Sequence, residues 1–256
     1  MGTEAGTDAE HCLGLGVGAH MFSKSAELYD AVYAAKDYAR EAQRLHALIE
    51  HHKRSGGARL LDVACGTGNH LTFLKRTYAV EGLDLHDAML AIARRKHPDV
   101  AFHRADMVEF DLGREFDVVV CLFSSIGYVG TDPRLRQALR TMRRHTRPGG
   151  VVIVEPWLGP DTYRPGHVAA VYVDQPDLKV ARMNVARADG GKAVLDFHYL
   201  VATPRGIEYF TERHDLALFP HEAYLEAFRA CGLDVVYDPE GLIGRGLYIG
   251  TRPLKD

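Results

Sequence analysis

The sequence predicts an α/β fold, a doubly wound and mostly parallel seven-stranded sheet that carries an antiparallel β insertion. Between residues 59 and 154, apolar runs of strand length alternate with helical patterns, which is typical of a parallel sheet with both faces covered. A glycine-rich loop at residues 62–68 follows the first of these runs. After Trp157 the pattern changes to long alternating segments, which indicate antiparallel strands.

Two features precede the first strand. Residues 1–20 are rich in Gly, Ala and Thr and have no apolar period, so we expect a flexible tail. Within it, residues 14–18 imitate a ligand-binding glycine loop, but no strand precedes them and no long helix directly follows. Apolar residues then recur at helical spacing from Ser25 to His52, which predicts one or two helices.

The main sheet follows in regular alternation. We expect strands at residues 59–64, 79–85, 101–104, 116–122 and 151–154, and intervening helices at 69–76 and 88–95. Thr131 caps a further helix with Pro133 in its first turn, and residues 148–150 (Pro-Gly-Gly) close it. The chain after the insertion predicts one helix and two strands that rejoin the sheet, at residues 221–231, 234–237 and 246–252.

The insertion contains four expected strands, at residues 168–174, 178–187, 193–203 and 206–218. The chain is thereby divided into a tail (1–20), a core (21–157 and 219–256) and an insertion (158–218). An exposed antiparallel sheet can pair with a second subunit, which leaves a homodimer open.

Composition and charge restrict the partners. The 256 residues carry a formal net charge of -3, so no nucleic-acid or anionic-lipid surface is indicated and a small molecule is the expected partner. No stretch reaches the roughly 18 apolar residues of a membrane span, and the N-terminus lacks a secretory pattern, so we expect a cytoplasmic protein. The four cysteines show no CxxC spacing and the histidines no metal-ligand spacing, which predicts free thiols and no metal.

The loop Asp62–Gly68 lies between a buried strand and a helix, where glycines let the backbone approach a ligand. A dinucleotide loop requires a third glycine where this chain has Leu71. The pattern D-x-A-C-G-T-G is instead similar to the glycine motif of class I S-adenosylmethionine methyltransferases. The resemblance implies their Rossmann-like fold, S-adenosyl-L-methionine as cofactor, and a loop (Ala64, Gly66, Gly68) that holds its amino-acid part.

Further candidate cofactor-binding residues follow at the ends of successive strands. Asp84 ends the second strand about 20 residues beyond the loop, where an acidic side chain can accept both ribose hydroxyls. The resemblance also implies that Asp106 reads the adenine amino group beside Met107 and that Leu122 contacts the cofactor. Either aspartate alone is more often a helix cap, but together these strand ends favour the cofactor.

Enzymes that methylate the exocyclic amines of nucleic-acid bases carry N/D/S-P-P-Y/F after the fourth strand. This chain has Cys121 to Tyr128 there without that motif, which argues against the class. The helix after Thr131 is rich in arginine, but such charges usually form a solvated face, so no nucleic-acid partner is expected.

From about Ala26 to Tyr248, the chain resembles the N,N-dimethyltransferases that finish amino sugars such as desosamine and mycaminose on a dTDP carrier. The landmarks besides the glycine loop are residues 26–30, 36–38, 106–107, 123–127, 154–157 and 244–247. The resemblance implies transfer of one or two methyl groups to the amine of a dTDP-linked 3-amino sugar in antibiotic biosynthesis.

The resemblance assigns roles around that substrate. It implies that Tyr29 and Arg40 close over the cofactor, that Phe22 covers the sugar, and that Arg245 meets the diphosphate or its thymidine side. A guanidinium flanked by glycines is free to bind phosphate oxygens in bidentate fashion, although a surface salt bridge is the alternative. Core packing is the alternative for both aromatic residues.

Two residues are candidates for contact with the reacting amine. Glu155 follows a buried strand at the ligand-binding edge of the sheet, where it can orient the amine or act as a structural acceptor. Tyr128 lies where related sugar enzymes place histidine, and it can hydrogen-bond the amine or help it lose a proton. Trp157 belongs to the same landmark as Glu155, but Leu158 and Gly159 follow it where these enzymes more often carry a second aromatic residue.

The insertion is expected to form part of the acceptor site. Arg182 and Tyr199 lie on its alternating strands, and strand parity places His198 and Tyr199 on opposite faces. We expect Tyr199 to face the ligand. Two alternatives remain at this point: a methyltransferase for another small-molecule amine or hydroxyl, and a noncatalytic cofactor-binding partner protein.

Overall fold

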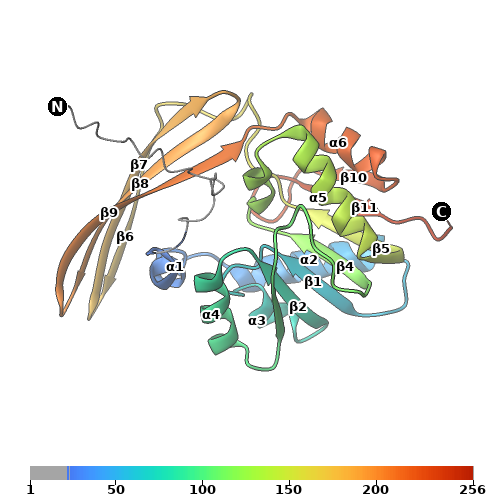
Figure 1. Cartoon of the computed structure of the whole chain (residues 1–256), viewed down its shortest axis with the longest axis horizontal. Coiled ribbons are helices and arrows are strands. Elements are labelled where there is room, and N and C mark those ends of the chain that lie inside the picture. Colours follow the sequence, from blue (N-terminus) through green and yellow to red (C-terminus); the bar gives the residue numbers. More distant parts are fainter. Residues whose placement is uncertain (1–21, 23, 256) are drawn as a thin grey trace, which may run out of the picture.

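A computed structural model of the chain describes residue 22 and residues 24–255 (Figure 1). The expected tail, the stretch 14–18 and Cys12 therefore lie outside the described residues. Cys65, Cys121 and Cys231 are free thiols, as predicted for them.

The main sheet confirms the predicted fold class. Its strands are β1 (Arg59–Val63), β2 (Ala79–Asp84), β3 (Ala101–Arg104), β4 (Phe116–Cys121), β5 (Thr146–Val154), β10 (Asp234–Asp238) and β11 (Leu247–Thr251). They lie in the order β10-β11-β5-β4-β1-β2-β3. β1 to β5 pair in parallel, and β11 runs antiparallel to both β5 and β10. The loops after β1 to β5 consequently meet at one edge of the sheet.

Helices cover both faces of this sheet. They are α1 (Ala26–Val32), α2 (Tyr38–His52), α3 (Leu71–Leu74), α4 (Asp87–Lys96), α5 (Asp132–Arg144), α6 (His221–Ala230) and the 3₁₀ helix η1 (Ser125–Val129). All of β4 is buried, and its side chains alternate between two cores. Val119 packs with α5 and α6, whereas Val118 and Val120 pack with α2 on the opposite face.

The insertion forms a separate sheet of four strands, β6 (Val168–Gln175), β7 (Leu178–Asp189), β8 (Lys192–Thr203) and β9 (Gly206–Ala217). All neighbouring strands pair antiparallel, as the alternation predicts. Figure 1 shows this sheet at one end of the molecule, with α1 between it and the main sheet. Leu28 and Val32 of α1 pack against Val173, Val180 and Val201 on its inner face.

Three local expectations need correction. The expected helix at 69–76 is reduced to the four residues of α3. Residues 148–150 do not close α5, which ends at Arg144; they lie inside β5, where the pairing with β4 shifts its register and Gly149 has a φ of 76°. Thr131 takes the N-cap position of α5, but its side chain makes no capping hydrogen bond.

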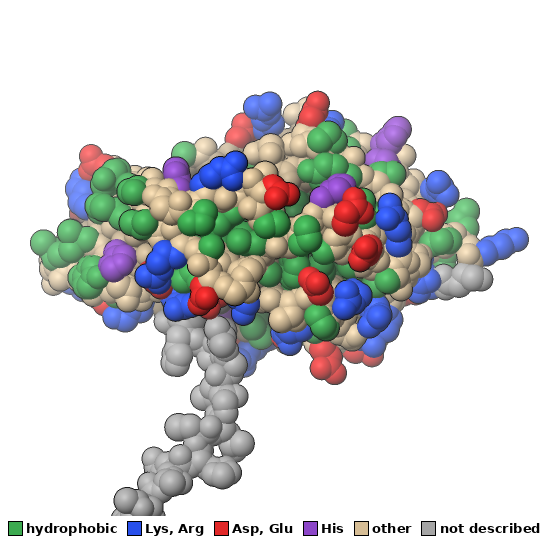
Figure 2. All heavy atoms as spheres, turned by 90° about the horizontal axis from the view of Figure 1, so that it is seen from above, with side chains coloured by type: hydrophobic (Ala, Val, Ile, Leu, Met, Phe, Trp, Pro, Cys, Tyr) green, Lys and Arg blue, Asp and Glu red, His purple; other side chains and the backbone are tan. Residues whose placement is uncertain are grey.

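The face seen in Figure 2 carries charges of both signs, interspersed with hydrophobic and other side chains. Within the described part of the chain, no helix combines the length and the apolar character that a bilayer crossing requires.

Candidate functional site

The carboxyl edge of the main sheet and the inner face of the insertion sheet line one cavity of about 1930 Å³. A single small-molecule site usually occupies roughly 300–1,000 Å³. This cavity therefore has room for two ligands together, as a group-transfer reaction requires.

The loop after β1 turns sharply because three of its residues adopt left-handed conformations. Ala64, Gly66 and Gly68 have φ angles of 61°, 55° and 75°. A Cβ on Gly66 would meet nothing within 4 Å, and both Ala64 and Gly66 line the cavity. Gly68 does not line the cavity. It faces the ring of His97, which a Cβ at Gly68 would approach to 3.0 Å. Gly68 thus permits close packing behind the loop instead of the expected ligand contact.

Asp84 ends β2 beside this loop and is only 6% exposed. Its carboxylate accepts the N–H of Gly66 at 2.8 Å and the N–H of His86 at 2.9 Å. Burial raises the pKa of Asp84, and these two hydrogen bonds oppose the shift. Asp84 therefore fixes the glycine loop from the same edge at which it lines the cavity.

Asp106 and Met107 follow β3 and line the same cavity. Asp106 accepts the N–H of Val108 at 2.9 Å and pairs with Arg134 of α5 at 3.0 Å. Arg134 itself lines the cavity, so this arginine does not belong to a purely solvated helix face.

A smaller cavity adjoins the glycine loop and is lined by Tyr29, Asp62 and Leu122 among others. Burial, with a smaller contribution from the charge of Asp84, raises the pKa of Asp62 to about 8. Leu122 lines this smaller cavity and is 3% exposed.

The segment before α1 and the helix itself cover the loop. Tyr29 lines both cavities, and the ring of Phe22 lies edge-on to it with centroids 6.1 Å apart. Phe22 has a φ of 58°, which is uncommon for an aromatic residue.

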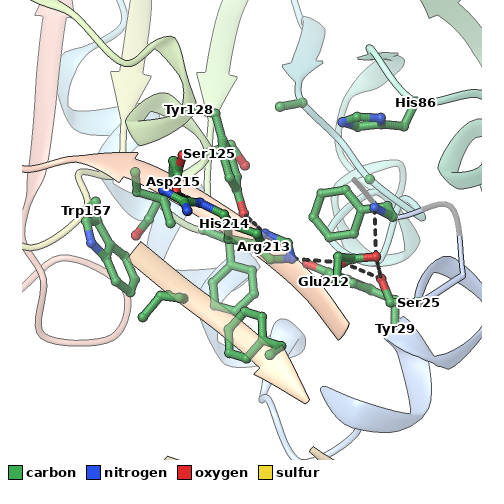
Figure 3. A pocket seen from close by; sticks show the side chains of 18 of the residues that line it. Ser25, Tyr29, His86, Ser125, Tyr128, Trp157, Glu212, Arg213, His214 and Asp215 are labelled. Atoms are coloured by element: carbon green, nitrogen blue, oxygen red, sulfur yellow. Dashed lines mark hydrogen bonds and ion pairs between the residues drawn. The ribbon is translucent and has the colours of Figure 1, made fainter. Parts of the chain in front are cut away.

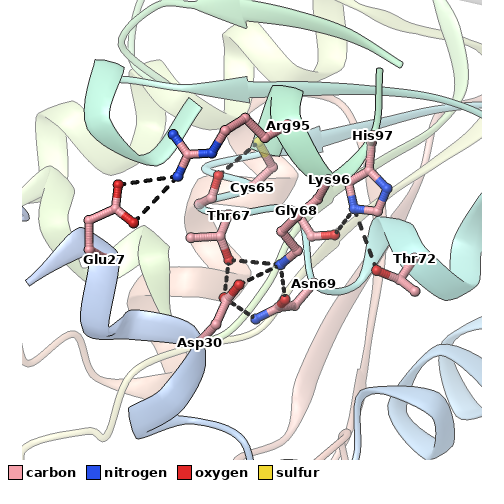
Figure 4. A network of polar contacts seen from close by, with 11 residues as sticks. Glu27, Asp30, Cys65, Thr67, Gly68, Asn69, Thr72, Arg95, Lys96 and His97 are labelled. Carbon is pink, nitrogen blue, oxygen red and sulfur yellow. Dashed lines mark hydrogen bonds and ion pairs between the residues drawn. The ribbon is translucent and has the colours of Figure 1, made fainter. Parts of the chain in front are cut away.

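Asp30 ties α1 to the glycine loop (Figure 4). Its carboxylate accepts hydrogen bonds from Thr67 at 2.6 Å, Asn69 at 3.0 Å and Lys96 at 2.8 Å. Burial alone raises the pKa of Asp30, but these hydrogen bonds outweigh it and hold the pKa below its ordinary value.

Arg40 does not join the site. It is exposed on α2 and lines neither cavity, so the structure does not support the expectation that it closes over the cofactor. Helical phase explains this, because the next residues, Glu41 and Ala42, begin the buried face of α2.

Glu155 follows β5 and is 0% exposed. One of its oxygens accepts the N–H of Phe123 at 2.6 Å, and the other is buried without a partner among the described residues. Burial raises the pKa of Glu155, and the Phe123 N–H and the charges of Lys36 and Arg245 oppose the shift. Phe123 and Ser124 both have positive φ, so the backbone is strained where it meets this carboxylate.

Arg245 lies on the cavity wall in the segment before β11. Its guanidinium donates to the hydroxyl of Ser124 at 2.9 Å and lies 4.8 Å from the ring centroid of Trp157. Burial lowers its pKa, and the nearby charge of Glu155 opposes that shift. Among the described residues no carboxylate lies within ion-pair distance of Arg245, so the salt-bridge alternative is not supported.

Arg182 and Tyr199 line the cavity from β7 and β8. Arg182 donates to the hydroxyl of Tyr33 at 3.0 Å and lies 4.6 Å from the ring centroid of Phe197. Tyr199 is 4% exposed, whereas His198 is exposed on the outer face. The predicted orientation of this neighbouring pair is confirmed.

Tyr128 of η1 lines the cavity and joins two residues that the sequence analysis missed (Figure 3). Its hydroxyl lies 2.7 Å from Nδ1 of His214, and Nε2 of His214 lies 2.8 Å from Glu212. Glu212 and His214 are two residues apart on β9, so they share its buried inner face. The sequence offered no clear signal for them, because both faces of β9 mix polar and apolar residues.

Comparison with known proteins gives this geometry its context. A family model described as a methyltransferase domain matches residues 60–150. The dTDP-3-amino-3,6-dideoxy-alpha-D-glucopyranose N,N-dimethyltransferase of Streptomyces fradiae is 47% identical over 90% of this chain and 91% of its own length. This chain belongs to the amino-sugar N,N-dimethyltransferase family of class I S-adenosylmethionine methyltransferases.

Solved structures agree. The crystal structure of DesVI from Streptomyces venezuelae superposes with a TM-score of 0.84 and 40% identity, over 89% of this chain and 98% of DesVI. CalS10, an amino pentose methyltransferase from Micromonospora echinaspora solved with bound S-adenosylmethionine, gives 0.80 and 38%, over 88% and 96%. The chain is an enzyme, so the alternative of a noncatalytic partner protein is not retained.

The residues present fit the cofactor. Open space beside Gly66, the buried Asp84 and the apolar Met107 provide a backbone contact, a hydroxyl acceptor and an apolar wall at one sheet edge. Among the described residues, no cluster of three His, Cys, Asp or Glu side chains has the arrangement of a metal site.

Proposed function

We propose that this enzyme transfers one or two methyl groups from S-adenosylmethionine to the amine of a dTDP-linked amino sugar in antibiotic biosynthesis. One observation carries the proposal: a single cavity extends from the glycine loop to Arg245 and Tyr199. The Streptomyces fradiae relative, by its name, acts on a dTDP-linked 3-amino sugar, which supports the same substrate class here.

In this proposal the residues divide between the two ligands. The cofactor side consists of Tyr29, Ala64, Gly66, Asp84, Asp106, Met107 and Leu122. The substrate side, to which the insertion 158–218 contributes, consists of Phe22, Trp157, Arg182, Tyr199 and Arg245, with Tyr128 nearest the amine. Glu155 lines neither cavity and would act from behind the turn at Phe123, whose N–H it accepts. Arg245 suits the diphosphate because it is largely buried and has no carboxylate partner among the described residues.

Bound S-adenosylmethionine supplies an electrophilic methyl group. The protein contributes by holding the amine in line with it and by excluding water, which are the main requirements of such a displacement. The aromatic rings of Phe22, Tyr29 and Tyr128 lie around one side of the cavity and serve this purpose.

Mass spectrometry of products from a panel of dTDP-sugars tests the proposal. The panel includes 3-amino and 4-amino sugars and, as the control, the matching 3-hydroxy sugar. We expect a gain of one or two methyl groups only on aminated sugars. Equal activity on amines without the nucleotide carrier would favour the alternative of another small-molecule substrate.

We also propose a homodimer formed through the outer face of the insertion sheet. Large apolar side chains are exposed there, including Tyr172, Ile207 and Tyr209 at 69%, 75% and 61%. Light scattering of the wild type and of an Ile207→Asp, Tyr209→Asp variant tests this, and a wild-type monomer would refute it. We propose a cytoplasmic location, which suits the free thiols and can be checked by cell fractionation.

A further inference from the structure

Glu212, His214 and Tyr128 form a continuous hydrogen-bonded chain that ends in the cavity (Figure 3). The buried end is anchored by the segment before α1. Glu212 accepts the N–H of Phe22 at 3.1 Å, and the Ser25 hydroxyl lies 2.8 Å and 2.9 Å from its two oxygens. Glu212 and His214 are 7% and 3% exposed, so bulk water does not separate the members of this chain.

The direction of the hydrogen bonds follows from the partners. Glu212 is an acceptor in its contacts with Phe22 and Ser25, and as a carboxylate it accepts from His214 as well. Nε2 of His214 then carries the proton, which leaves a lone pair on Nδ1. Tyr128 donates its O–H to Nδ1 and retains oxygen lone pairs with which to accept an N–H from a ligand in the cavity.

We propose that His214, acting through Tyr128, takes the proton that the substrate amine must lose before each methyl transfer. The inference deepens the proposed function and rests on it. An amine near neutral pH is largely an ammonium ion, which has no lone pair with which to attack.

Tyr128 cannot perform this task alone. Burial, followed by the nearby Tyr33 and Glu212, raises the pKa of Tyr128 well above 10, so its phenolate is scarce at neutral pH. As a neutral phenol, however, it can accept one proton while it passes its own to His214.

Two protons move when the substrate ammonium loses one through Tyr128. An ammonium N–H bond breaks as its proton joins the Tyr128 oxygen, and the original phenol proton moves to Nδ1 of His214. The result is a neutral amine, a neutral phenol and an imidazolium held between Tyr128 and Glu212. The amine lone pair would then form the new nitrogen–carbon bond as the sulfur–methyl bond of bound S-adenosylmethionine breaks, and the bonding electron pair would leave with the sulfur of the thioether product. The methylated product is again an ammonium ion, so the imidazolium must release its proton to water before a second transfer.

The surroundings of His214 permit an imidazolium. Glu212 on the same strand supplies the compensating negative charge, and the ring of Phe197 on β8 packs with its centroid 5.0 Å away. His86, before α4, also interacts with His214, and burial lowers the pKa of His86. Tyr29, Tyr33, Asp84 and Tyr199 also interact with Tyr128.

The test compares His214→Asn with a matched control. The asparagine amide can retain a hydrogen bond to Tyr128 but cannot take a proton. The control is His46→Asn on α2, away from the cavity, where His46 Nδ1 likewise lies 2.7 Å from a tyrosine hydroxyl, that of Tyr78. The measurement is kcat and KM of both variants between pH 6.5 and 9 with a dTDP-amino sugar, together with the cofactor Kd by calorimetry.

We expect His214→Asn to lower kcat about 100-fold at pH 7, with the deficit shrinking about tenfold per pH unit as neutral amine accumulates. Cofactor Kd and the control stay within twofold of wild type. A deficit below threefold, or one that is constant with pH, overturns the proposal. If His214→Asn does not fold, Tyr128→Phe gives the same test, because it removes only the hydroxyl. Absence of wild-type product on every amino sugar would instead refute the proposed function itself.

Discussion

Asp84 accepts the backbone N–H of Gly66 at 2.8 Å, so the two cofactor-site residues that the sequence marks on successive strand ends are bonded to each other. The carboxylate of Asp84 has two roles. It fixes the loop conformation from one oxygen and, at the cavity wall, retains acceptor capacity for a ligand hydroxyl. In the proposed function, preorganisation of the loop and recognition of the cofactor therefore depend on the same side chain.

Asp84→Asn should weaken cofactor binding about 10- to 100-fold. The two carboxylate oxygens of Asp84 accept the N–H groups of Gly66 and His86, and in asparagine an NH₂ group, which cannot accept, replaces one of these oxygens. Calorimetric titration with S-adenosylmethionine measures this. Asp99→Asn, an exposed aspartate paired with Lys75, is the control and should change Kd by less than twofold. A Kd for Asp84→Asn within twofold of wild type contradicts the prediction.

Arg245→Lys should raise KM for the dTDP-amino sugar at least about tenfold, with kcat changed less than about threefold. Lysine keeps the charge but loses the planar donor fork that binds phosphate and stacks on Trp157. Steady-state kinetics with the cofactor saturating give both constants. Arg205→Lys, at an exposed turn of the insertion, should leave them unchanged. An unchanged KM in Arg245→Lys would favour a substrate without the nucleotide carrier.

The cofactor half of the site could be predicted because the fold itself brings it together. Parallel strands end at the same edge of the sheet, so three candidate residues that follow successive strands, Ala64, Asp84 and Asp106, line one cavity. Strand parity was equally informative for His198 and Tyr199. Where only family resemblance placed a residue, as for Arg40, helical phase turned the side chain to solvent.

The acceptor half was less predictable for a physical reason. Tyr128 and His214 are 86 positions apart and meet only because the insertion sheet folds over η1. Nothing in local propensity encodes how two sheets are positioned. Glu212 and His214 lie on a strand face that also carries Glu208, so the strand pattern did not distinguish them.

Asp30→Asn should reduce the free energy of unfolding by about 1 kcal/mol at pH 7. This figure allows for the 39% exposure of the side chain, which weakens its three hydrogen bonds. Because the folded-state pKa of Asp30 is lowered, this stabilisation exists above the unfolded pKa and is lost as the pH falls through the folded pKa. Urea unfolding should therefore show wild type and variant converging in acid. Asp174→Asn, exposed beside Lys179, should show no comparable difference at pH 7.

Glu155→Gln should change the stability of the protein and its binding of the substrate in opposite directions. Because burial raises the folded-state pKa of Glu155, wild-type stability is greatest while the carboxyl is protonated and falls as the pH rises through that pKa. The variant cannot lose a proton there, and its amide oxygen can still accept the Phe123 N–H. We therefore expect equal unfolding free energies near pH 4, below the unfolded pKa of about 4.3. At pH 8 the variant should be more stable by on the order of 1 kcal/mol, since one buried oxygen of the carboxylate has no partner among the described residues.

At pH 8 the same variant should raise KM for the amino sugar about tenfold, because a charged acceptor for the amine or a hydroxyl is replaced by a neutral one. Urea unfolding and steady-state kinetics at both pH values measure the two effects, with Glu208→Gln at the exposed Lys24 pair as the control. A variant that is less stable at pH 8 and has an unchanged KM would identify Glu155 as a purely structural acceptor. A more stable variant with impaired substrate binding would instead mean that the strained turn at Phe123 and Ser124 holds a costly charge in place for the substrate.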